Sequence, residues 1–217
     1  MKTTHFLFFL IAMALISGTY TNGQGIDYKK YGIETIEKQI PEGLKPGDTA
    51  PAFSGYDQKG TFTESRKILE KGPMVLFFYR GNWCPVCNRY LQNYQDSLSI
   101  IADQGVSVVA ITPESIEYVE TTVKMHNLSF TVIYDCMEKI MADYKVMFSV
   151  TEEYQKKLLS STSTDLIKIN GHPEAHLPVP ATYIINSQGI IVAAWFDPDY
   201  RKRAPVKWML QNLAKAL

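Results

Sequence analysis

Apolar residues along the chain fall into short continuous runs and into longer stretches with helical spacing. The run Val75–Tyr79 predicts a strand that is covered on both faces. From Cys87 to Ile101 the apolar residues recur every three or four positions, which predicts a helix that closes at Gly105. A second run, Val106–Ile111, predicts another buried strand. Together these elements form a βαβ unit, which is normally parallel and right-handed.

The same pattern predicts a second group of elements beyond this unit. We expect a helix that opens at 112–114, a strand at 131–135 and a short helix from 137 to about 146. Residues 147–178 look irregular apart from a helical piece around 152–160, and a connection of that length is usually functional or a lid. A hairpin signature at 182–195 and a final helix from 206 follow. The order is βαβ, an αβ insertion, then ββα, which predicts an α/β fold with a central mixed sheet flanked by helices.

Composition limits the classes of function. A chain of 217 residues with 46% hydrophobic and 20% charged residues is long enough for one well-buried globular domain. Lys and Arg total 22, as do Asp and Glu, so no overall positive charge attracts nucleic acid or an anionic membrane.

The N-terminus has the pattern of a secretory signal. Lys2 precedes the apolar run Phe6–Ile16, and small or polar residues follow it. The run is too short for a membrane span of about 20 residues. We therefore predict a signal peptide at 1–23, an N-terminal extension at 24–44 and one domain at 45–217. The mature protein is expected to be exported, to the periplasm or outside the cell, with no membrane span.

The segment RGNWCPVCNRY carries the candidate chemistry, because it places Cys84 and Cys87 two residues apart behind Trp83. Such a pair can bind zinc, form a structural disulfide, exchange disulfides or reduce peroxides. It falls where the first predicted strand ends and its helix begins, and backbone N–H groups at a helix start stabilise a thiolate. Pro85 suits the first helical position. A structural bridge that closes so small a loop stabilises little, so the pattern favours a reactive pair.

The strand, the WCPVC segment and a later proline before a hairpin resemble the thioredoxin superfamily. The matching later piece is Leu177–Tyr183, and 46–53, 78–87 and 197–200 also match the peroxiredoxin-like branch of the alkyl hydroperoxide reductase/thiol-specific antioxidant family. The resemblance implies a thioredoxin-like fold and an oxidoreductase without a cofactor. The implied activity is reduction of hydroperoxides with electrons from an external thiol donor, such as a thioredoxin-like protein.

The resemblance also implies roles for individual residues. Cys84 and Cys87 are the catalytic pair, supported by the residues Arg80, Trp83, Pro85, Val179 and Pro180. The family's attacking cysteine ends a TxxC motif, so it matches Cys87, and Cys84 replaces the threonine. The family's late arginine is replaced by Pro180, for which we predict a cis bond to Val179 beside the cysteines. Arg80 or Arg203 is a candidate for the missing cation.

Alternative functions stay open at this point. Thioredoxin-like exchange with protein disulfides would make Cys84 the attacking thiol. A zinc site could join the two cysteines to His172 and His176, although 84 residues separate the pairs and polar loop histidines are the simpler interpretation, so we predict no metal. A binding module without chemistry is the third alternative. Cys136 is expected to be a small buried hydrophobe, with resolving thiol as its alternative role.

Overall fold

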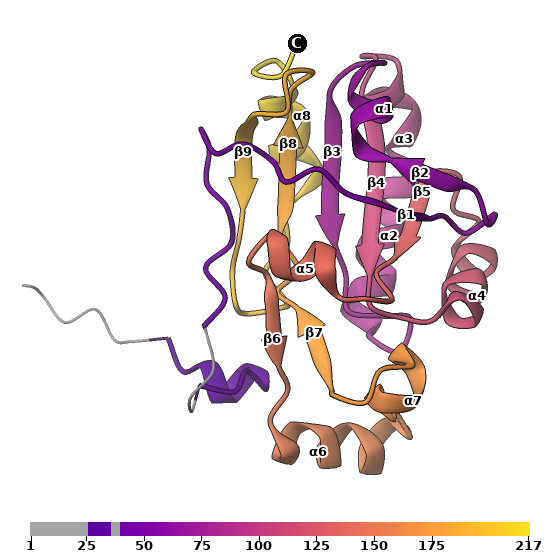
Figure 1. The fold of residues 1–217 in the computed structure, drawn as a ribbon, viewed down its shortest axis with the longest axis vertical. Helices are drawn as coiled ribbons and strands as arrows, with labels where there is room; N and C mark the ends of the chain where they lie inside the picture. Colours follow the sequence, from indigo (N-terminus) through magenta and orange to yellow (C-terminus); the bar gives the residue numbers. More distant parts are fainter. Residues whose placement is uncertain (1–25, 36–39) are drawn as a thin grey trace, which may run out of the picture.

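Five strands form the central sheet of the computed structural model, which describes residues 26–35 and 40–217 (Figure 1). Their spatial order is β5-β4-β3-β8-β9. The strands are β3 (Met74–Phe78), β4 (Ser107–Thr112), β5 (Thr131–Tyr134), β8 (Thr182–Ile185) and β9 (Ile191–Trp195). β3 pairs parallel with β4 and antiparallel with β8. The sheet is therefore mixed, as the sequence pattern predicts.

Both faces of the sheet are buried, which explains the continuous apolar run of β3. Val75 and Phe77 pack on one side, in a core that also receives side chains from four helices, α2 (Pro85–Asp96), α3 (Leu98–Ala102), α4 (Ile116–His126) and α8 (Val206–Leu213). Leu76 and Phe78 point into a second core on the other side, together with residues of α5 (Lys139–Asp143). Because strand side chains alternate between faces, a strand buried on both faces needs apolar residues at every position.

Two local features differ from the sequence prediction. The helix expected as far as Gly105 is divided, since α2 ends before Ser97 and α3 covers Leu98–Ala102. An N-terminal hairpin, β1 (Ser54–Tyr56) with β2 (Phe62–Glu64), runs into α1 (Ser65–Leu69), and the sequence analysis did not predict these elements. Strands of three residues are too short to show a clear alternation. A 3₁₀-helix, η1 (Tyr28–Tyr31), lies further towards the N-terminus.

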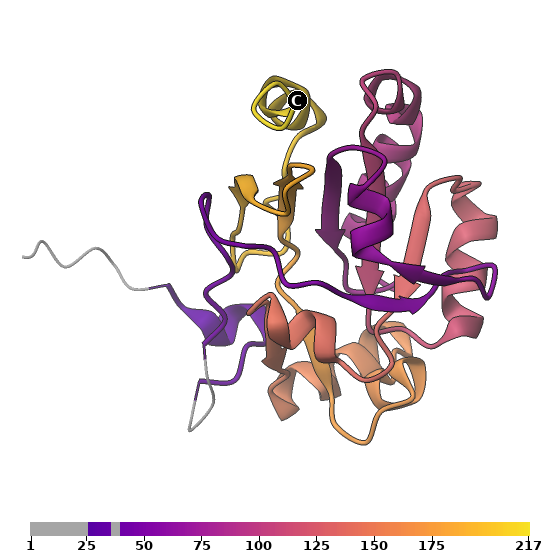
Figure 2. The same cartoon turned by 45° about the horizontal axis from the view of Figure 1, so that its top comes forward.

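The segment 147–178 is ordered, so its description as irregular is wrong apart from the predicted helical piece. It forms β6 (Met147–Ser149), α6 (Glu152–Thr162), α7 (Leu166–Asn170) and β7 (His176–Pro178). β6 and β7 pair antiparallel, and side chains of Thr151 and Asp165 cap the two helices. This insertion lies at one end of the sheet in both ribbon views (Figures 1 and 2). Its own small core includes Phe148, Leu158 and Leu177.

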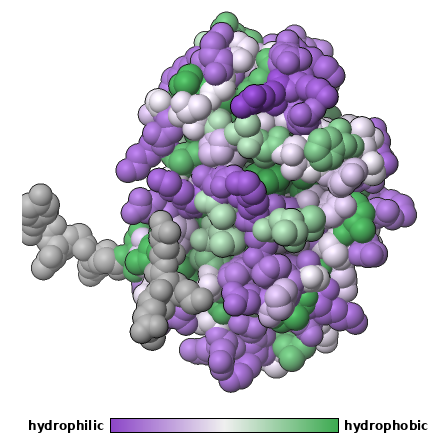
Figure 3. Space-filling view, viewed as in Figure 1, coloured by the Kyte–Doolittle hydropathy of each residue, from purple (hydrophilic) through white to green (hydrophobic). Residues whose placement is uncertain are grey.

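The surface is mixed in character. On the face shown in Figure 3, hydrophobic residues occur as small separate groups among hydrophilic ones. In the part of the chain that the structure describes, no helix has the length and apolar character needed to cross a membrane. The predicted signal peptide lies outside the described residues.

Candidate active site

The two cysteines lie at the start of α2, directly beyond the end of β3. Cys84 is the N-cap of this helix and Pro85 follows within the first turn, as predicted from the sequence. The Cys84 Sγ accepts a hydrogen bond from the Cys87 backbone N–H at 3.4 Å. The sulfur thus caps the helix in the way that a serine or threonine oxygen would. Both cysteines are free thiols and both are buried.

Cys87 has the environment of a stabilised thiolate. The Arg203 Nη2 donates a hydrogen bond to its Sγ over 3.1 Å, and Arg203 is itself buried. Burial alone would raise the pKa of Cys87. A hydrogen bond from Cys84 and the positive charges of Arg203 and Arg80 outweigh burial, so this pKa lies well below the usual value. The negative charge of the pair therefore belongs on Cys87.

Cys84 takes the opposite role. Its hydrogen bond to Cys87, together with burial, raises the pKa of Cys84 far above that of an ordinary thiol. Because the two sulfurs share one proton, Cys84 keeps it and Cys87 stays charged. The two cysteines differ little in exposure, with 3% for Cys84 and 0% for Cys87.

Arg80 is a second buried cation at the site and is surrounded by aromatic rings. Its guanidinium carbon lies 4.1 Å from the ring centre of Tyr200 and 4.7 Å from that of Trp83. Its Nη2 donates a hydrogen bond to the Tyr154 hydroxyl over 2.9 Å. Trp83 stands beside α2, Tyr154 comes from α6 of the insertion, and Tyr200 comes from the loop after β9. The neighbouring Trp83 and two distant segments therefore hold Arg80 in place.

The site also contains a carboxyl group that the sequence analysis did not single out. Glu114 is fully buried, and one of its oxygens accepts a hydrogen bond from the Asn82 N–H at 2.8 Å. Burial raises the pKa of Glu114 to about 8. Gly81, with φ of 145°, leaves room for this contact, because a Cβ there would lie 2.7 Å from the Glu114 Oε1. The signal in the sequence was a glutamate two residues after the end of a buried strand.

The predicted cis bond before Pro180 is wrong, because the described residues contain no cis peptide bond. The Val179 N–H donates to the Val146 carbonyl over 2.8 Å, which continues the pairing of β7 past its last residue. The Ala181 N–H then donates to the Val179 carbonyl over 2.7 Å, so the chain makes a tight turn at Pro180 before β8. Val179 is buried in the same small core as Trp83, and Pro180 is also buried.

Two other residues differ from their expected surroundings. Cys136 is exposed, which contradicts its interpretation as a buried hydrophobe. His176 is buried within β7 and is not a polar loop residue. His172 and His176 gather around Glu138 and not around the cysteines, which removes the basis for a shared cysteine–histidine zinc site.

Comparison with known proteins agrees with this arrangement. The model of the AhpC/TSA family matches residues 46–194, more than half of the chain. The chain belongs to the AhpC/TSA family. It is thus related to thiol-dependent oxidoreductases with a thioredoxin-like fold, as the sequence resemblance implied.

Relatives within this group carry two kinds of name. The chain is 30% identical to a chloroplastic peroxiredoxin Q of Sedum lineare, over 77% of this chain and 78% of the relative. It is 24% identical to the thiol-disulfide oxidoreductase ResA of Bacillus subtilis, over 70% and 67% of the two chains. The crystal structure of peroxidoxin BcpB from Mycobacterium tuberculosis superposes with a TM-score of 0.61 at 18% identity, covering 80% and 96% of the chains. That likeness confirms the thioredoxin-like fold.

Proposed function

We propose that this protein is a thiol peroxidase in which Cys87 attacks the hydroperoxide and Cys84 resolves the product. The observation that carries the proposal is the Arg203 hydrogen bond to the Cys87 sulfur, at 3.1 Å in a buried site. A thiolate is the nucleophilic form of cysteine, and a buried cation favours it. The peroxiredoxin name of the similar Sedum lineare protein supports the same activity.

The reaction balances with the groups that the site supplies. The Cys87 thiolate attacks one peroxide oxygen, the O–O bond breaks, and the departing alkoxide takes up a proton to leave as an alcohol. Cys87 is thereby oxidised to a sulfenic acid. The Cys84 sulfur then attacks the Cys87 sulfur, water leaves, and a Cys84–Cys87 disulfide forms. An external dithiol reduces this disulfide, so that electrons pass from the dithiol to the peroxide.

Arg203 and Arg80 stabilise negative charge throughout this sequence. Both are buried next to Cys87, and both lower its pKa. A cation beside the sulfur also faces the oxygen that gains charge as the O–O bond breaks. These two residues therefore take the place of the family's late arginine, where this chain has Pro180.

Exchange with protein disulfides is the second candidate, supported by the name of the relative ResA and by the CxxC spacing. In that reaction Cys84 must act as the attacking thiolate. The raised pKa of Cys84 and its 3% exposure disfavour this, because a protein disulfide has to reach its sulfur. A hydroperoxide is small enough to approach a buried thiolate.

Peroxide consumption by cysteine variants separates the two candidates. We expect Cys87→Ser to lower the rate to that of buffer alone. Cys84→Ser should complete one turnover and stop as a sulfenic acid, detected as a dimedone adduct on Cys87 by peptide mass spectrometry. Cys136→Ser is the matched control and should keep full activity. If Cys84→Ser prevents the first turnover, or if the wild type reduces insulin disulfides but consumes no peroxide, disulfide exchange replaces peroxide reduction.

Two further proposals concern the surroundings of the enzyme. A thioredoxin-like protein is the proposed electron donor, because its dithiol can reduce a CxxC disulfide. Export is proposed from the apolar run Phe6–Ile16 after Lys2. Intact mass of the protein isolated from its native cells should show that the chain begins near residue 19 to 25. A full-length cytosolic species would contradict export.

A further inference from the structure

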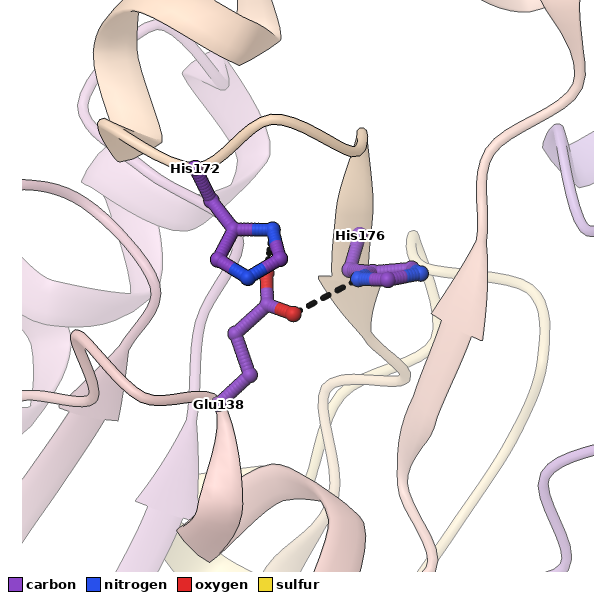
Figure 4. Close-up of side chains that lie close together, drawn as sticks. All are labelled: Glu138, His172 and His176. Atoms are coloured by element: carbon purple, nitrogen blue, oxygen red, sulfur yellow. Dashed lines mark hydrogen bonds and ion pairs between the residues drawn. The ribbon is translucent and has the colours of Figure 1, made fainter.

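A second cluster of reactive side chains lies where the insertion contacts the start of α5. Glu138 immediately precedes α5, His172 follows α7, and His176 is the first residue of β7. One oxygen or nitrogen from each of these residues lies within 4.8 Å of those of the other two. Figure 4 shows the Glu138 carboxylate pointing between the two imidazole rings. The cluster joins two parts of the chain that are more than 30 residues apart in sequence.

The carboxylate at the centre of this cluster is buried and incompletely paired. The Glu138 side chain is 8% exposed. Its Oε2 lies 2.6 Å from the His176 Nδ1, and its Oε1 lies 3.5 Å from the His172 Nδ1. Among the described residues no hydrogen-bond donor reaches Oε1. A buried anionic oxygen without a donor is costly, and a bound cation removes that cost.

Contacts with Glu174 orient the two imidazole rings for binding a cation. The 2.6 Å contact between the His176 Nδ1 and the Glu138 Oε2 is a hydrogen bond that Nδ1 donates, and a cation that binds here replaces its proton. The His176 Nε2 lies 3.2 Å from the Glu174 Oε2, so the remaining ring proton has an acceptor on that side. A carboxylate behind the far nitrogen of a metal-binding histidine is the usual way to fix its tautomer. The His172 Nδ1 also lies 3.3 Å from the Glu174 N–H, a contact in which the ring nitrogen accepts. Two electron-rich atoms, this nitrogen and the Glu138 Oε1, then face each other.

We propose that Glu138, His172 and His176 bind a divalent transition-metal ion, with Zn²⁺ as the preferred cation. Two imidazole nitrogens and one carboxylate oxygen suit zinc, whereas Mg²⁺ and Ca²⁺ prefer oxygen ligands only. Ligands 2.0–2.1 Å from a tetrahedral zinc lie about 3.4 Å apart. The present separations of 2.6 and 3.5 Å therefore require only a small opening of the cluster. His172, whose side chain is 30% exposed, is the ligand freest to adjust.

The ion would link the start of α5 to the start of β7, because Glu138 and His176 would both bind it. Its three protein ligands leave the fourth position for water or another small ligand. The same insertion carries Tyr154, which holds Arg80 at the cysteine site. Zinc binding is therefore expected to stabilise the insertion from a site separate from the reacting sulfurs.

Zinc titration of the full chain lacking its thiols tests the site. Cys84→Ser, Cys87→Ser and Cys136→Ser are combined, because a CxxC pair binds zinc by itself. After treatment with a chelator, calorimetry with Zn²⁺ alone should give one ion per chain. Adding Glu138→Gln or His176→Gln should weaken binding at least about 100-fold, since each removes one of three ligands. His126→Gln, in α4, is the matched control and should bind as the parent does.

A spectroscopic measurement on the wild type guards against variants that fail to fold. X-ray absorption of the zinc-loaded protein, with the cysteines first oxidised to their disulfide, should show nitrogen and oxygen neighbours at about 2.0 Å and no sulfur at about 2.3 Å. Zinc should also raise the melting temperature of the thiol-free chain, but not that of its Glu138→Gln form. The proposal is overturned if the thiol-free chain binds no zinc, if the ligand variants bind as the parent does, or if sulfur coordinates the ion.

Discussion

The cysteine site and the Glu138 cluster surround a buried anion with different partners. Cys87 faces Arg203 and Arg80, whose guanidinium groups stay protonated over the whole pH range in which proteins fold. Glu138 faces the imidazoles of His172 and His176, which can lose a proton and then offer a lone pair. The first arrangement provides a permanent positive charge. In the second, a metal ion bound by the imidazoles can supply the positive charge.

This difference shows how the chemical role of a buried anion follows from its partner. At the cysteines the fixed charge helps to lower the pKa of Cys87, whereas the hydrogen bond to Cys87 and burial raise the pKa of Cys84. At Glu138 a guanidinium group would have closed the site to metals, because it has no lone pair to offer. The insertion contributes residues to both the cysteine site and the Glu138 cluster, since Tyr154 contacts Arg80 and β7 carries His176.

Removal of the permanent charge beside Cys87 should have the largest effect. Arg203→Gln takes away a charged hydrogen bond to the thiolate, a contact that contributes roughly 1.5–3 kcal/mol. We expect the second-order rate constant for peroxide at pH 7 to fall about 10- to 100-fold. Because the wild-type pKa of Cys87 is lowered, the wild-type rate should fall only in acid, as pH drops through that pKa. In the variant, the pH at which the rate falls should shift upwards.

Stopped-flow measurements of the peroxide reaction from pH 4 to 9 provide this comparison. Arg201→Gln is the matched control. Arg201 lies two residues before Arg203, but it is exposed and pairs with Asp199. An Arg203→Gln profile that coincides with the wild-type profile would show that the guanidinium does not set the charge of Cys87.

The neutral carboxyl of Glu114 should produce the next largest effect, on stability. Burial raises the pKa of Glu114 to about 8, whereas its ordinary value is 4.5. Between these values the folded chain keeps a proton that the unfolded chain has lost. The free energy of unfolding therefore falls as pH rises from about 4.5 to 8. Glu114→Gln removes this pH-dependent loss, so the stability of the variant relative to the wild type should increase by about 3 kcal/mol between pH 5 and pH 7.5.

Urea unfolding at several pH values measures that gain. Glu120→Gln, at an exposed position of α4, is the control and should leave the wild-type pH dependence in place. Parallel stability curves for Glu114→Gln and wild type would contradict a protonated Glu114.

Removal of the hydroxyl that links the insertion to Arg80 should have the smallest effect. Tyr154→Phe deletes the acceptor of the Arg80 Nη2 hydrogen bond, and the cation–π contacts of Arg80 with Trp83 and Tyr200 remain. We expect a loss of about 1 kcal/mol in stability and a decrease of about 3-fold in peroxide rate. Tyr56→Phe, at an exposed tyrosine of β1, should change neither. An unchanged Tyr154→Phe enzyme would show that the insertion does not position Arg80.

The sequence by itself determined the succession of the main strands and helices along the chain, the βαβ unit and the place of the cysteines. Those features follow from local patterns, since continuous apolar runs specify strands buried on both faces and Cys84-Pro85 specifies a helix start. The short strands β6 and β7 escaped prediction because three residues show no clear periodicity. Local patterns therefore gave the framework of the active site, and the family resemblance added Arg80 and Trp83 as candidates within it.

Only the tertiary structure decided which partners the reactive groups have. Arg203 is 116 residues from Cys87 in sequence, and Tyr154 is 74 residues from Arg80. Glu138 is likewise 38 residues from His176. No pattern within a strand or helix encodes such distances, because they depend on how the insertion and the loop after β9 pack against the end of the sheet. That packing assigns the thiolate to Cys87, and it leaves Glu138 between two imidazoles.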